Sequence, residues 1–374
     1  MSNPTSSYDT IIIGGGQAGL STGYYLQQQG RDFVILDASE RIGAAWRKRW
    51  DSLRLFTPAR YSGLPGMSFP APAHLPPTKD EMADYLEAYA GRFKLPVRMG
   101  IQVDRLARQG DRFVVTAGDR RFEAENVVVA TGGYYSPRVP AFAAELKPNI
   151  RQLHSSEYQR PSQLQAGTVL VVGAGNSGAE IALELSRSHK VWLSGRHPGS
   201  EPTRAGGVAD RLVAPLIWFV FSKVMTVNTP IGRKAAAQLR GHGLPLARVK
   251  PADLQTAGVE RVYPRTAGVR DGLPLLEDGR SLDVTNVIWC TGFRPDYGWI
   301  TLPIFDDDGE PRHERGVVVS EPGLYFVGLF FQSAATSSLV GGVGKDAAYI
   351  AKEIAAQESR ITNGRQPSAL ARTA

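Results

Sequence analysis

The chain has 374 residues, 43 of them basic and 36 acidic, which gives a net charge of +7 and enough length for two domains of ordinary size. The charges are scattered, without the basic block typical of nucleic-acid binding, so we expect no nucleic-acid partner. The single cysteine, Cys290, excludes an internal disulfide and the cysteine pair on which dithiol reductases depend.

The sequence gives no sign of a membrane anchor. Residues 1–8 are short and polar, unlike a secretory signal peptide, and no apolar run reaches the ~20 residues needed to span a bilayer. We therefore expect a cytoplasmic protein without stable membrane insertion.

A glycine-rich fingerprint follows the first predicted strand. Residues 14–19 are Gly-Gly-Gly-Gln-Ala-Gly, after apolar residues 11–13 and before a helix-like stretch at 20–29. In such a turn the glycines permit a tight bend, let the backbone approach a pyrophosphate, and let the helix pack closely on the strand. Asp37 ends the next predicted strand, where an acid hydrogen-bonds ribose hydroxyls and repels a 2′-phosphate. This predicts a site for the AMP half of FAD, or for NAD.

Loops and short strands follow this unit. Residues 38–80 are rich in proline and aromatic side chains, which is typical of loops that line sites. Thr78, with Glu81 three residues on, predicts a capped helix running to about Phe93. Residues 100–125 alternate as short strands, and residues 126–133 predict a buried strand that ends in small residues able to pass close to a cofactor.

A second fingerprint, Gly-Ala-Gly-Asn-Ser-Gly, occupies residues 173–178, after apolar residues 169–172 and before a helix-like stretch at 179–187. Its next predicted strand, 190–194, ends in Gly195 and Arg196 with no acid. Arginine there can pair with a 2′-phosphate, so the sequence favours NADPH over NADH. The alternative is that Arg196 is an ordinary surface arginine.

The stretch 211–227 is strongly apolar between basic residues. The favoured interpretation is a helix that covers a domain seam or an oligomer contact. A helix lying on a membrane surface, or lining a substrate tunnel, is the less favoured alternative.

The strand predicted at 287–290 contains Cys290, which we expect to be buried and unreactive. It is followed by Thr291 and Gly292, which repeats the pattern at residues 131 and 132, and a last buried strand leads to Gly328. This order predicts an α/β fold of two Rossmann-like dinucleotide-binding domains, an FAD domain with an inserted NADPH domain. The expected segments are 1–165 and 287–357 for the FAD domain, 166–286 for the NADPH domain, and 358–374 for a disordered tail.

Taken together, these residues resemble the flavin-containing monooxygenases, the class B single-component flavoprotein monooxygenases, from Tyr8 to about Ile354. The resemblance rests on both fingerprints, Gly43-Ala44-Ala45-Trp46, Ala130-Thr131-Gly132 and the run from Cys290 to Asp296. The fingerprints and the resemblance assign to FAD Gly14, Gly16, Gln17, Ala18, Gly19, Asp37, Trp46, Thr131, Gly132 and Gly328. They assign to NADPH Gly173, Gly175, Asn176, Ser177, Gly178, Arg196, Thr291 and Gly292.

Two departures from the family pattern matter. The linker signature keeps only its second half, His154 to Tyr158, and by resemblance His154 lies at the domain hinge and organises it. The asparagine that amine-oxidising members place beside the flavin is missing, because no Asn occurs between Trp46 and Asn126. The chain is in this respect closer to the branches that include indole-3-pyruvate and arsenic-resistance monooxygenases.

The resemblance implies a small-molecule substrate, O2, FAD and NADPH, with one oxygen atom transferred to an organic or metalloid substrate through a C4a-hydroperoxyflavin. Candidate side chains near the chemistry are Arg54, Thr57 and Gln332, and no metal cluster is expected. The competing interpretations are an NADPH-dependent reductase that passes electrons to a quinone, a ferredoxin or another acceptor, and a non-catalytic nucleotide sensor. A homo-oligomer is compatible with the sequence.

Overall fold

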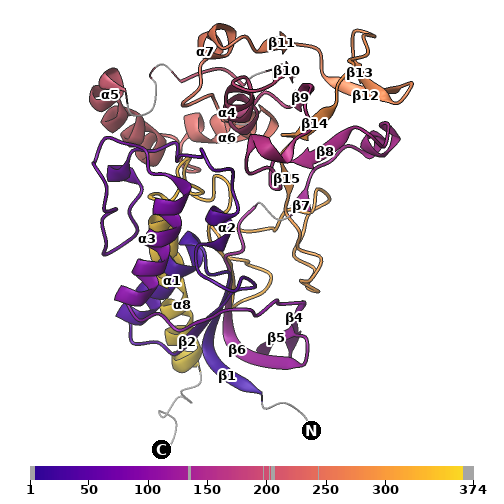
Figure 1. Cartoon of the computed structure of the whole chain (residues 1–374). Coiled ribbons are helices and arrows are strands. Elements are labelled where there is room, and N and C mark those ends of the chain that lie inside the picture. Colours follow the sequence, from indigo (N-terminus) through magenta and orange to yellow (C-terminus); the bar gives the residue numbers. More distant parts are fainter. Residues whose placement is uncertain are drawn as a thin grey trace, which may run out of the picture.

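The structure, a computed structural model, describes residues 5–364 apart from 134, 135, 197, 202, 204–206 and 243. Its elements form two lobes, each built around its own sheet (Figure 1). This confirms the expected α/β architecture of two Rossmann-like units. The part of the expected tail from residue 365 onward lies outside the described residues, whereas helix α8 continues to Gly364, beyond the expected end near residue 357.

The first lobe contains a seven-stranded sheet in which the long strand β6 has three neighbours. On one side β6 pairs with β1 from Phe122 to Val129; on the other side its amino-terminal half pairs with β5 and its carboxyl-terminal end with β16. The strands are β1 (Ser6–Ile13), β2 (Phe33–Leu36), β3 (Val97–Arg98), β4 (Arg105–Gln109), β5 (Arg112–Ala117), β6 (Arg120–Val129) and β16 (Leu324–Phe326). The β1, β2, β3, β6 and β16 ladders are parallel, so their carboxyl ends meet at one edge, where ligands bind in such sheets.

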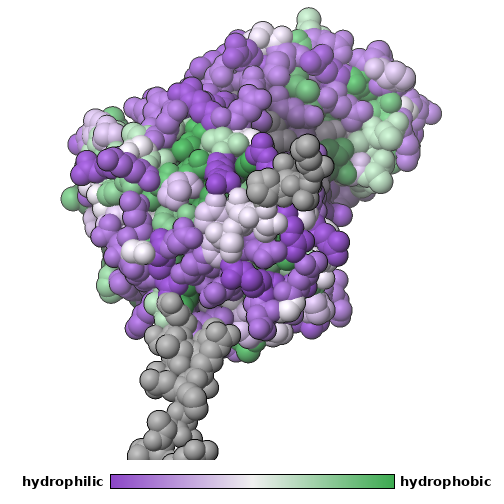
Figure 2. All heavy atoms as spheres, turned by 90° about the horizontal axis from the view of Figure 1, so that it is seen from below, coloured by the Kyte–Doolittle hydropathy of each residue, from purple (hydrophilic) through white to green (hydrophobic). Residues whose placement is uncertain are grey.

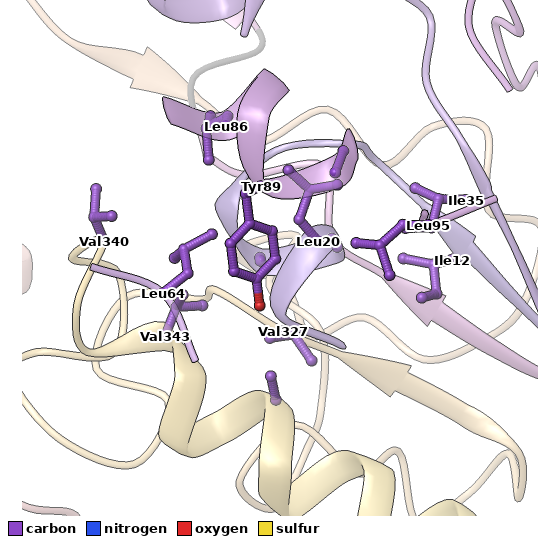
Figure 3. Packing of buried hydrophobic residues seen from close by; sticks show 14 of the residues in the cluster. Ile12, Leu20, Ile35, Leu64, Leu86, Tyr89, Leu95, Val327, Val340 and Val343 are labelled. Atoms are coloured by element: carbon purple, nitrogen blue, oxygen red, sulfur yellow. The ribbon is translucent and has the colours of Figure 1, made fainter. Parts of the chain in front are cut away.

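Helices cover one face of this sheet. They are α1 (Gln17–Gln28), α3 (Lys79–Arg92) and α8 (Val343–Gly364). Tyr89 of α3 lies at the centre of the resulting core, among Leu20, Val327 and Val343 (Figure 3). Its hydroxyl donates a 2.7 Å hydrogen bond to the Pro65 carbonyl, which fixes the proline-rich loop to the core. The expected capping box of α3 is present, with Thr78 and Glu81 bonded reciprocally.

The second lobe contains a parallel five-stranded sheet with the order β11-β10-β9-β14-β8. Its strands are β8 (Arg151–His154), β9 (Thr168–Val172), β10 (Lys190–Ser194), β11 (Glu260–Val262) and β14 (Asn286–Trp289). One face packs on α4 (Asn176–Leu185) and α7 (Pro251–Thr256), and the other on the turn η2 (Ala141–Glu145) and the β12–β13 hairpin (Thr266–Arg270 and Leu273–Leu276).

Strand pairing favours wider bounds for this second unit than 166–286. Strands β8 and β14 both belong to its sheet, although the sequence placed them in the two parts of the FAD domain. The chain crosses between the lobes at β7 (Ser136–Pro137) and β15 (Phe293–Arg294), which pair with each other. We therefore propose that the inserted unit extends between these two crossings.

Several short helices lie outside the two sheets. They are α2 (Ala44–Arg47), η1 (Ala59–Tyr61), η3 (Pro161–Gln163), α5 (Val208–Phe219), the π-helical turn η4 (Val220–Val224) and α6 (Pro230–His242). The surface seen from below is mostly hydrophilic, with hydrophobic side chains confined to smaller patches (Figure 2). Among the described residues, no helix is long and apolar enough to cross a bilayer.

Candidate active site with two nucleotide cradles

The turn between β1 and α1 tolerates only glycine at two positions. Gly14 has a φ of +112°, and a Cβ there would lie 2.5 Å from the Ala130 carbonyl oxygen. A Cβ on Gly19 would lie 1.8 Å from the Gly14 carbonyl oxygen, because α1 begins directly against the end of β1. The close approach of strand, turn and helix therefore depends on these two glycines.

The same turn is open where a phosphate would lie. A Cβ on Gly16 would meet nothing within 4 Å, and α1 begins there without a side-chain cap. No side chain of the described residues caps the first N–H groups of α1, around Gln17 and Ala18, and these groups concentrate positive potential. A pyrophosphate group fits this arrangement.

Asp37 lies beside the first turn, as the sequence predicts for a ribose-binding acid. Its Oδ2 accepts a 2.6 Å hydrogen bond from the Gly15 N–H, and its Oδ1 accepts one of 2.8 Å from the Ser39 N–H. These bonds keep the carboxylate at the carboxyl end of β2, next to the fingerprint. A ribose hydroxyl can donate to the same carboxylate.

The second fingerprint has the same backbone geometry. Gly173 has a φ of +105°, with a hypothetical Cβ 2.3 Å from the Cys290 carbonyl oxygen, and that of Gly178 would lie 1.8 Å from the Gly173 oxygen. Gly175 is open within 4 Å, and α4 begins without a side-chain cap. This site therefore also suits a pyrophosphate.

Asn176 takes a different place from the one expected. Its amide nitrogen donates to the Leu244 and Pro245 carbonyls, at 3.3 and 3.0 Å, and its oxygen accepts from the Ala247 N–H at 3.0 Å. The side chain thus holds the loop 244–247 and is occupied by the chain itself. Only the backbone N–H groups of Asn176 and its half-buried neighbour Ser177 are positioned toward a nucleotide by the fingerprint.

Arg196 is exposed directly after Gly195, at the carboxyl end of β10. The structure adds a second arginine there that the sequence did not single out. Arg261 of β11 donates from Nη2 to the Gly195 carbonyl at 3.0 Å, whereas its Nη1 is buried without a hydrogen-bond partner. Burial lowers the pKa of Arg261, because the charged form loses hydration.

A cavity of about 340 Å³ lies beside Arg261 and the second fingerprint. Its lining residues are Ala174, Leu246, Pro251, Leu254, Gln255, Val259, Arg261 and Tyr263. An anion in this cavity would give the unpaired N–H of Arg261 a charge-assisted partner. A larger cavity, of about 510 Å³, includes Thr168 and Lys190 at the opposite, amino ends of β9 and β10, away from the fingerprints.

The remaining residues assigned to FAD surround the first fingerprint. Gly328 has a φ of +91°, and its Cβ would lie 3.0 Å from that of Ala18, so β16 and α1 meet closely there. Thr131 and Gly132 follow β6 and Ala130 in the sequence. The Ala130 carbonyl oxygen is the atom that would lie 2.5 Å from a Cβ on Gly14. Trp46 is half-buried on α2 and packs against the core under α1 and α3.

His154 contacts the second crossing between the lobes, which itself pairs with the first. Its Nε2 lies 3.0 Å from the Gly292 carbonyl oxygen, and its Nδ1 accepts from the Ser156 N–H at 3.2 Å, so Nε2 carries the proton. Burial lowers the pKa of His154 below its usual value, which keeps the ring neutral. Thr291 is fixed on the same crossing by a hydrogen bond from its Oγ1 to the Arg138 carbonyl.

The sequence candidates for the substrate side lie on two separate segments. Arg54 is exposed and donates to the Pro76 carbonyl at 3.0 Å, and Thr57 Oγ1 lies 2.9 Å from Ser62 Oγ. This loop is pressed against the turn before α8, since a Cβ on Gly341 would lie 2.0 Å from the Tyr61 carbonyl oxygen. Among the described residues, no hydrogen bond joins Arg54 or Thr57 to Gln332.

Gln332, the third candidate near the chemistry, is bonded to the backbone of its own loop and of residues 315 and 326. Its Oε1 accepts from the N–H groups of Gly328 and Leu329 at 3.0 and 3.3 Å. Its Nε2 donates to the carbonyls of Arg315 and Phe326 at 3.1 and 2.8 Å. Both amide hydrogens are therefore used by the backbone, and we propose that Gln332 positions the loop after β16.

Two further groups bear on the chemistry. Cys290 is half-buried rather than fully buried as expected, and loss of hydration raises the pKa of its thiol to about 12, which agrees with an unreactive thiol. Burial also raises the pKa of Glu180 in α4 to about 7, although Arg248 lies 3.2 Å away. Within the described part of the chain, no group of His, Cys, Asp or Glu could hold a metal ion.

Comparison with known proteins agrees with this geometry. Residues 11–224, more than half of the chain and both fingerprints, match the family described as pyridine nucleotide-disulphide oxidoreductase. The chain is 42% identical over 347 residues to an uncharacterized CzcO-like oxidoreductase of Geobacillus kaustophilus, covering 92% of this chain and 98% of that protein. It is 36% identical to the indole-3-pyruvate monooxygenase YUCCA1 of Oryza sativa over 181 residues, 47% of this chain and 45% of the rice protein.

Among solved structures, a double-mutant form of the flavin monooxygenase from Stenotrophomonas maltophilia superposes with a TM-score of 0.75 and 29% identity. The match covers 94% of this chain and 99% of that one. We call the two fingerprint turns, each with the helix N-terminus that follows it, the nucleotide cradles. These cradles and the relatives show that the chain belongs to the class B flavin monooxygenase family and is an oxidoreductase that uses FAD and NAD(P)H.

Proposed function

We propose that this protein is an FAD-dependent, NADPH-using monooxygenase that transfers one oxygen atom from O2 to a small organic or metalloid substrate. The observation that supports it most is the pair of matched nucleotide cradles, on two sheets whose connecting strands β7 and β15 lie together. A bound FAD would accept a hydride from NADPH and supply the oxygen chemistry in its reduced form. We place the reaction in the cytoplasm.

The first cradle is proposed to hold FAD. The open N-terminus of α1 would bind the pyrophosphate, and Asp37 would accept from the ribose of the AMP half. Gly328 and Thr131 lie at the neighbouring strand ends, where the chain comes close to α1 or to Gly14. These residues bind and orient the cofactor.

The second cradle is proposed to hold NADPH in preference to NADH. No acid follows β10, so nothing at that strand end repels a 2′-phosphate. Arg196 and Arg261 both lie at the carboxyl ends of β10 and β11, and one N–H group of Arg261 is left without a partner. A phosphate bound by both arginines would explain why the chain buries a cation there.

His154 is proposed as a positioning residue between the two cradles. Its hydrogen bond to Gly292 fixes the segment between β14 and β15, where the chain leaves the second lobe. Hydride transfer demands close alignment of two nucleotides held by different lobes, so the orientation of this segment controls the reaction.

The substrate side is proposed to lie where the loop 54–62 meets the turn before α8 and residues 225–227. Thr226 bridges to Ala334, and the Val227 N–H donates to the Ser333 carbonyl at 3.0 Å. Arg54, an exposed cation of this loop beside Thr57, would orient an anionic group of the substrate. Neighbouring backbone and apolar side chains would keep water from the reaction.

A two-stage rapid-mixing experiment tests the proposal. The purified yellow protein is reduced with NADPH without oxygen and then mixed with oxygenated buffer, while the flavin spectrum is followed. We expect a transient spectrum, distinct from both oxidised and reduced flavin, before the oxidised spectrum returns. Direct return of the oxidised flavin without such a phase would contradict oxygenation and favour the reductase interpretation, in which quinones and ferredoxins become the acceptors to assay.

A further inference from the structure

Helix α5 exposes a stripe of large apolar side chains. Val208, Leu212, Leu216 and Phe219 are 78%, 83%, 63% and 57% exposed, values that are high for such side chains. At 3.6 residues per turn these four positions fall within about 80° of the helix circumference. We call these four side chains the α5 stripe.

The opposite side of α5 is fixed to the body of the protein. Ala214 is buried, and Trp218 stacks on Tyr61 with ring centroids 4.8 Å apart and an interplanar angle of 15°. Residues 225 and 227, which follow the helix and its π turn, are hydrogen-bonded to residues 335 and 333. The stripe is thus held outward by the packing of the helix, and rotation of α5 would break the Trp218–Tyr61 stack.

The charge of this region is predominantly positive, since Asp210 near the beginning of α5 is followed by a long stretch without acidic residues. From residue 211 to residue 252 the sequence contains no Asp or Glu, although 36 acidic residues in 374 would place about four in a stretch of this length. Exposed cations flank the stripe: Arg211 lies on α5 and Lys223 on the turn that follows it. Arg233 and Lys234 are exposed on the next helix, α6.

We propose that the α5 stripe and its flanking cations bind reversibly to the surface of an anionic lipid bilayer. Apolar side chains on one face of a helix can enter the boundary between head groups and acyl chains, and flanking Lys and Arg then meet lipid phosphates. A second copy of the chain is a poorer occupant. A two-fold contact would bring the same cations of both copies together, and Asp210 is the single acid that residues 208–252 of each copy contain to pair with them.

The test is flotation of the FAD-loaded protein with two kinds of vesicle, one of phosphatidylcholine alone and one of phosphatidylcholine and phosphatidylglycerol in equal amounts. We expect flotation with the mixed vesicles only, and a loss of binding as salt concentration rises. The double variant Leu212→Glu/Leu216→Glu should reduce the floated fraction at least about tenfold, since it places charge in the apolar stripe. Arg211→Gln/Lys223→Gln should reduce it less, and mainly at low salt.

Val319→Glu is the matched control, because Val319 is 64% exposed, as Leu216 is 63%, but lies outside α5. This variant should float like the parent protein. The visible flavin spectrum and the rate of flavin reduction by NADPH should be unchanged in all variants, which separates lipid binding from folding and from the proposed reaction.

Failure of the parent protein to float with anionic vesicles, or flotation of the double variant equal to the parent, would overturn the proposal. Light scattering adds a further outcome. If the parent protein is a dimer that does not float, and the Leu212→Glu/Leu216→Glu variant is a monomer, the α5 stripe binds a second copy of the chain. This outcome would likewise overturn the proposal.

Discussion

The two nucleotide cradles share a backbone but differ in the side chains around it. A Cβ on Gly19 or on Gly178 would lie 1.8 Å from the carbonyl oxygen of the first glycine of its turn. A Cβ on Gly16 or on Gly175 would meet no atom within 4 Å. The next strand ends in Asp37 in one unit and leads to Gly195 and then Arg196 in the other. In the proposed function, the backbone common to both would bind the pyrophosphate, whereas the end of the neighbouring strand would decide which ribose is accepted.

A second difference lies one turn into each helix. Ser21 of α1 and Glu180 of α4 hold equivalent positions, two residues after the last glycine of each fingerprint, and both have a buried oxygen without a partner. Burial of a serine hydroxyl group destabilises the folded state little. A buried carboxyl group either ionises at a high cost in free energy or keeps its proton. The second unit therefore contains a titratable group that the first lacks.

The largest effect is expected from the glycines. Gly19→Ala should abolish FAD binding, and Gly178→Ala should leave the protein yellow but abolish reduction by NADPH, because each Cβ would overlap the backbone of its turn. The flavin absorbance and the rate of anaerobic reduction measure the two effects. Gly91→Ala on α3, where a Cβ would meet nothing within 4 Å, is the control and should change neither. A Gly178→Ala variant reduced as fast as the parent would show that the second cradle is not the nicotinamide site.

Substitution of the two arginines proposed to bind the 2′-phosphate should weaken the preference for NADPH over NADH. Arg196→Ala and Arg261→Ala are each expected to lower kcat/KM for NADPH about tenfold, and together about a hundredfold, with little change for NADH, because a charge-assisted bond to phosphate contributes roughly 1.5 to 3 kcal/mol. Steady-state rates with both cofactors measure this.

Arg280→Ala is the control for the arginine variants, since Arg280 lies at the cavity beside the amino ends of β9 and β10. It should leave both cofactors unaffected. An unchanged preference for NADPH in the Arg196→Ala/Arg261→Ala double variant would place the 2′-phosphate elsewhere.

Glu180 should make stability depend on pH. Its pKa is raised from 4.5 to about 7 by burial, so the native state retains a proton that the unfolded chain releases. The stabilising contribution is complete below pH 4.5 and is lost as the pH rises through about 7. Glu180→Gln should therefore stabilise the protein by about 2 kcal/mol at pH 8 and little at pH 5.

Urea unfolding of both proteins at the two pH values measures the effect of Glu180. Glu260→Gln, at an exposed carboxyl of the same unit that pairs with Lys190, should show no such gain at pH 8. A stability difference between Glu180→Gln and the parent that is equal at both pH values would contradict the raised pKa.

The smallest effect is expected from His154, which acts through Gly292. His154→Ala should slow flavin reduction by NADPH about fivefold without loss of FAD, because one hydrogen bond to the crossing is removed. His154→Gln, whose Nε2 can donate to the same carbonyl, should recover most of the rate. Since burial lowers the pKa of His154 below 6.5, the parent's reduction rate should show no inflection from this group above that pH. Equal rates in the alanine variant and the parent would remove the positioning role.

Much of the fold could be predicted because its signals are local. The fingerprints, the capping box at Thr78 and the buried strands all occur within short windows, and each has one compatible backbone geometry. The bounds of the second unit were less predictable, because β8 and β14 are recognised as its members only by their pairing with β9 and with each other. Sequence distance says little about which sheet a strand joins.

The site was predicted in part for the same reason. The tight turns at the fingerprint glycines and the place of Asp37 beside the first turn could be predicted, because they follow from backbone conformation and strand order. Arg261 was missed, since nothing in its neighbourhood along the chain indicates that its guanidinium reaches the Gly195 carbonyl. The hydrogen bonds of Gln332 could not be predicted either, because only the folded loop shows that its amide is used by four backbone groups.

By itself the sequence determined that the chain has two glycine-rich turns of the dinucleotide-binding kind and predicted which nucleotide each would take, because a glycine turn and an acid at a strand end are properties of a few adjacent residues. Only the tertiary structure decided which polar groups remain unpaired, which acid keeps its proton and which apolar side chains face outward. Those properties depend on burial, and burial is set by segments that meet from distant parts of the chain.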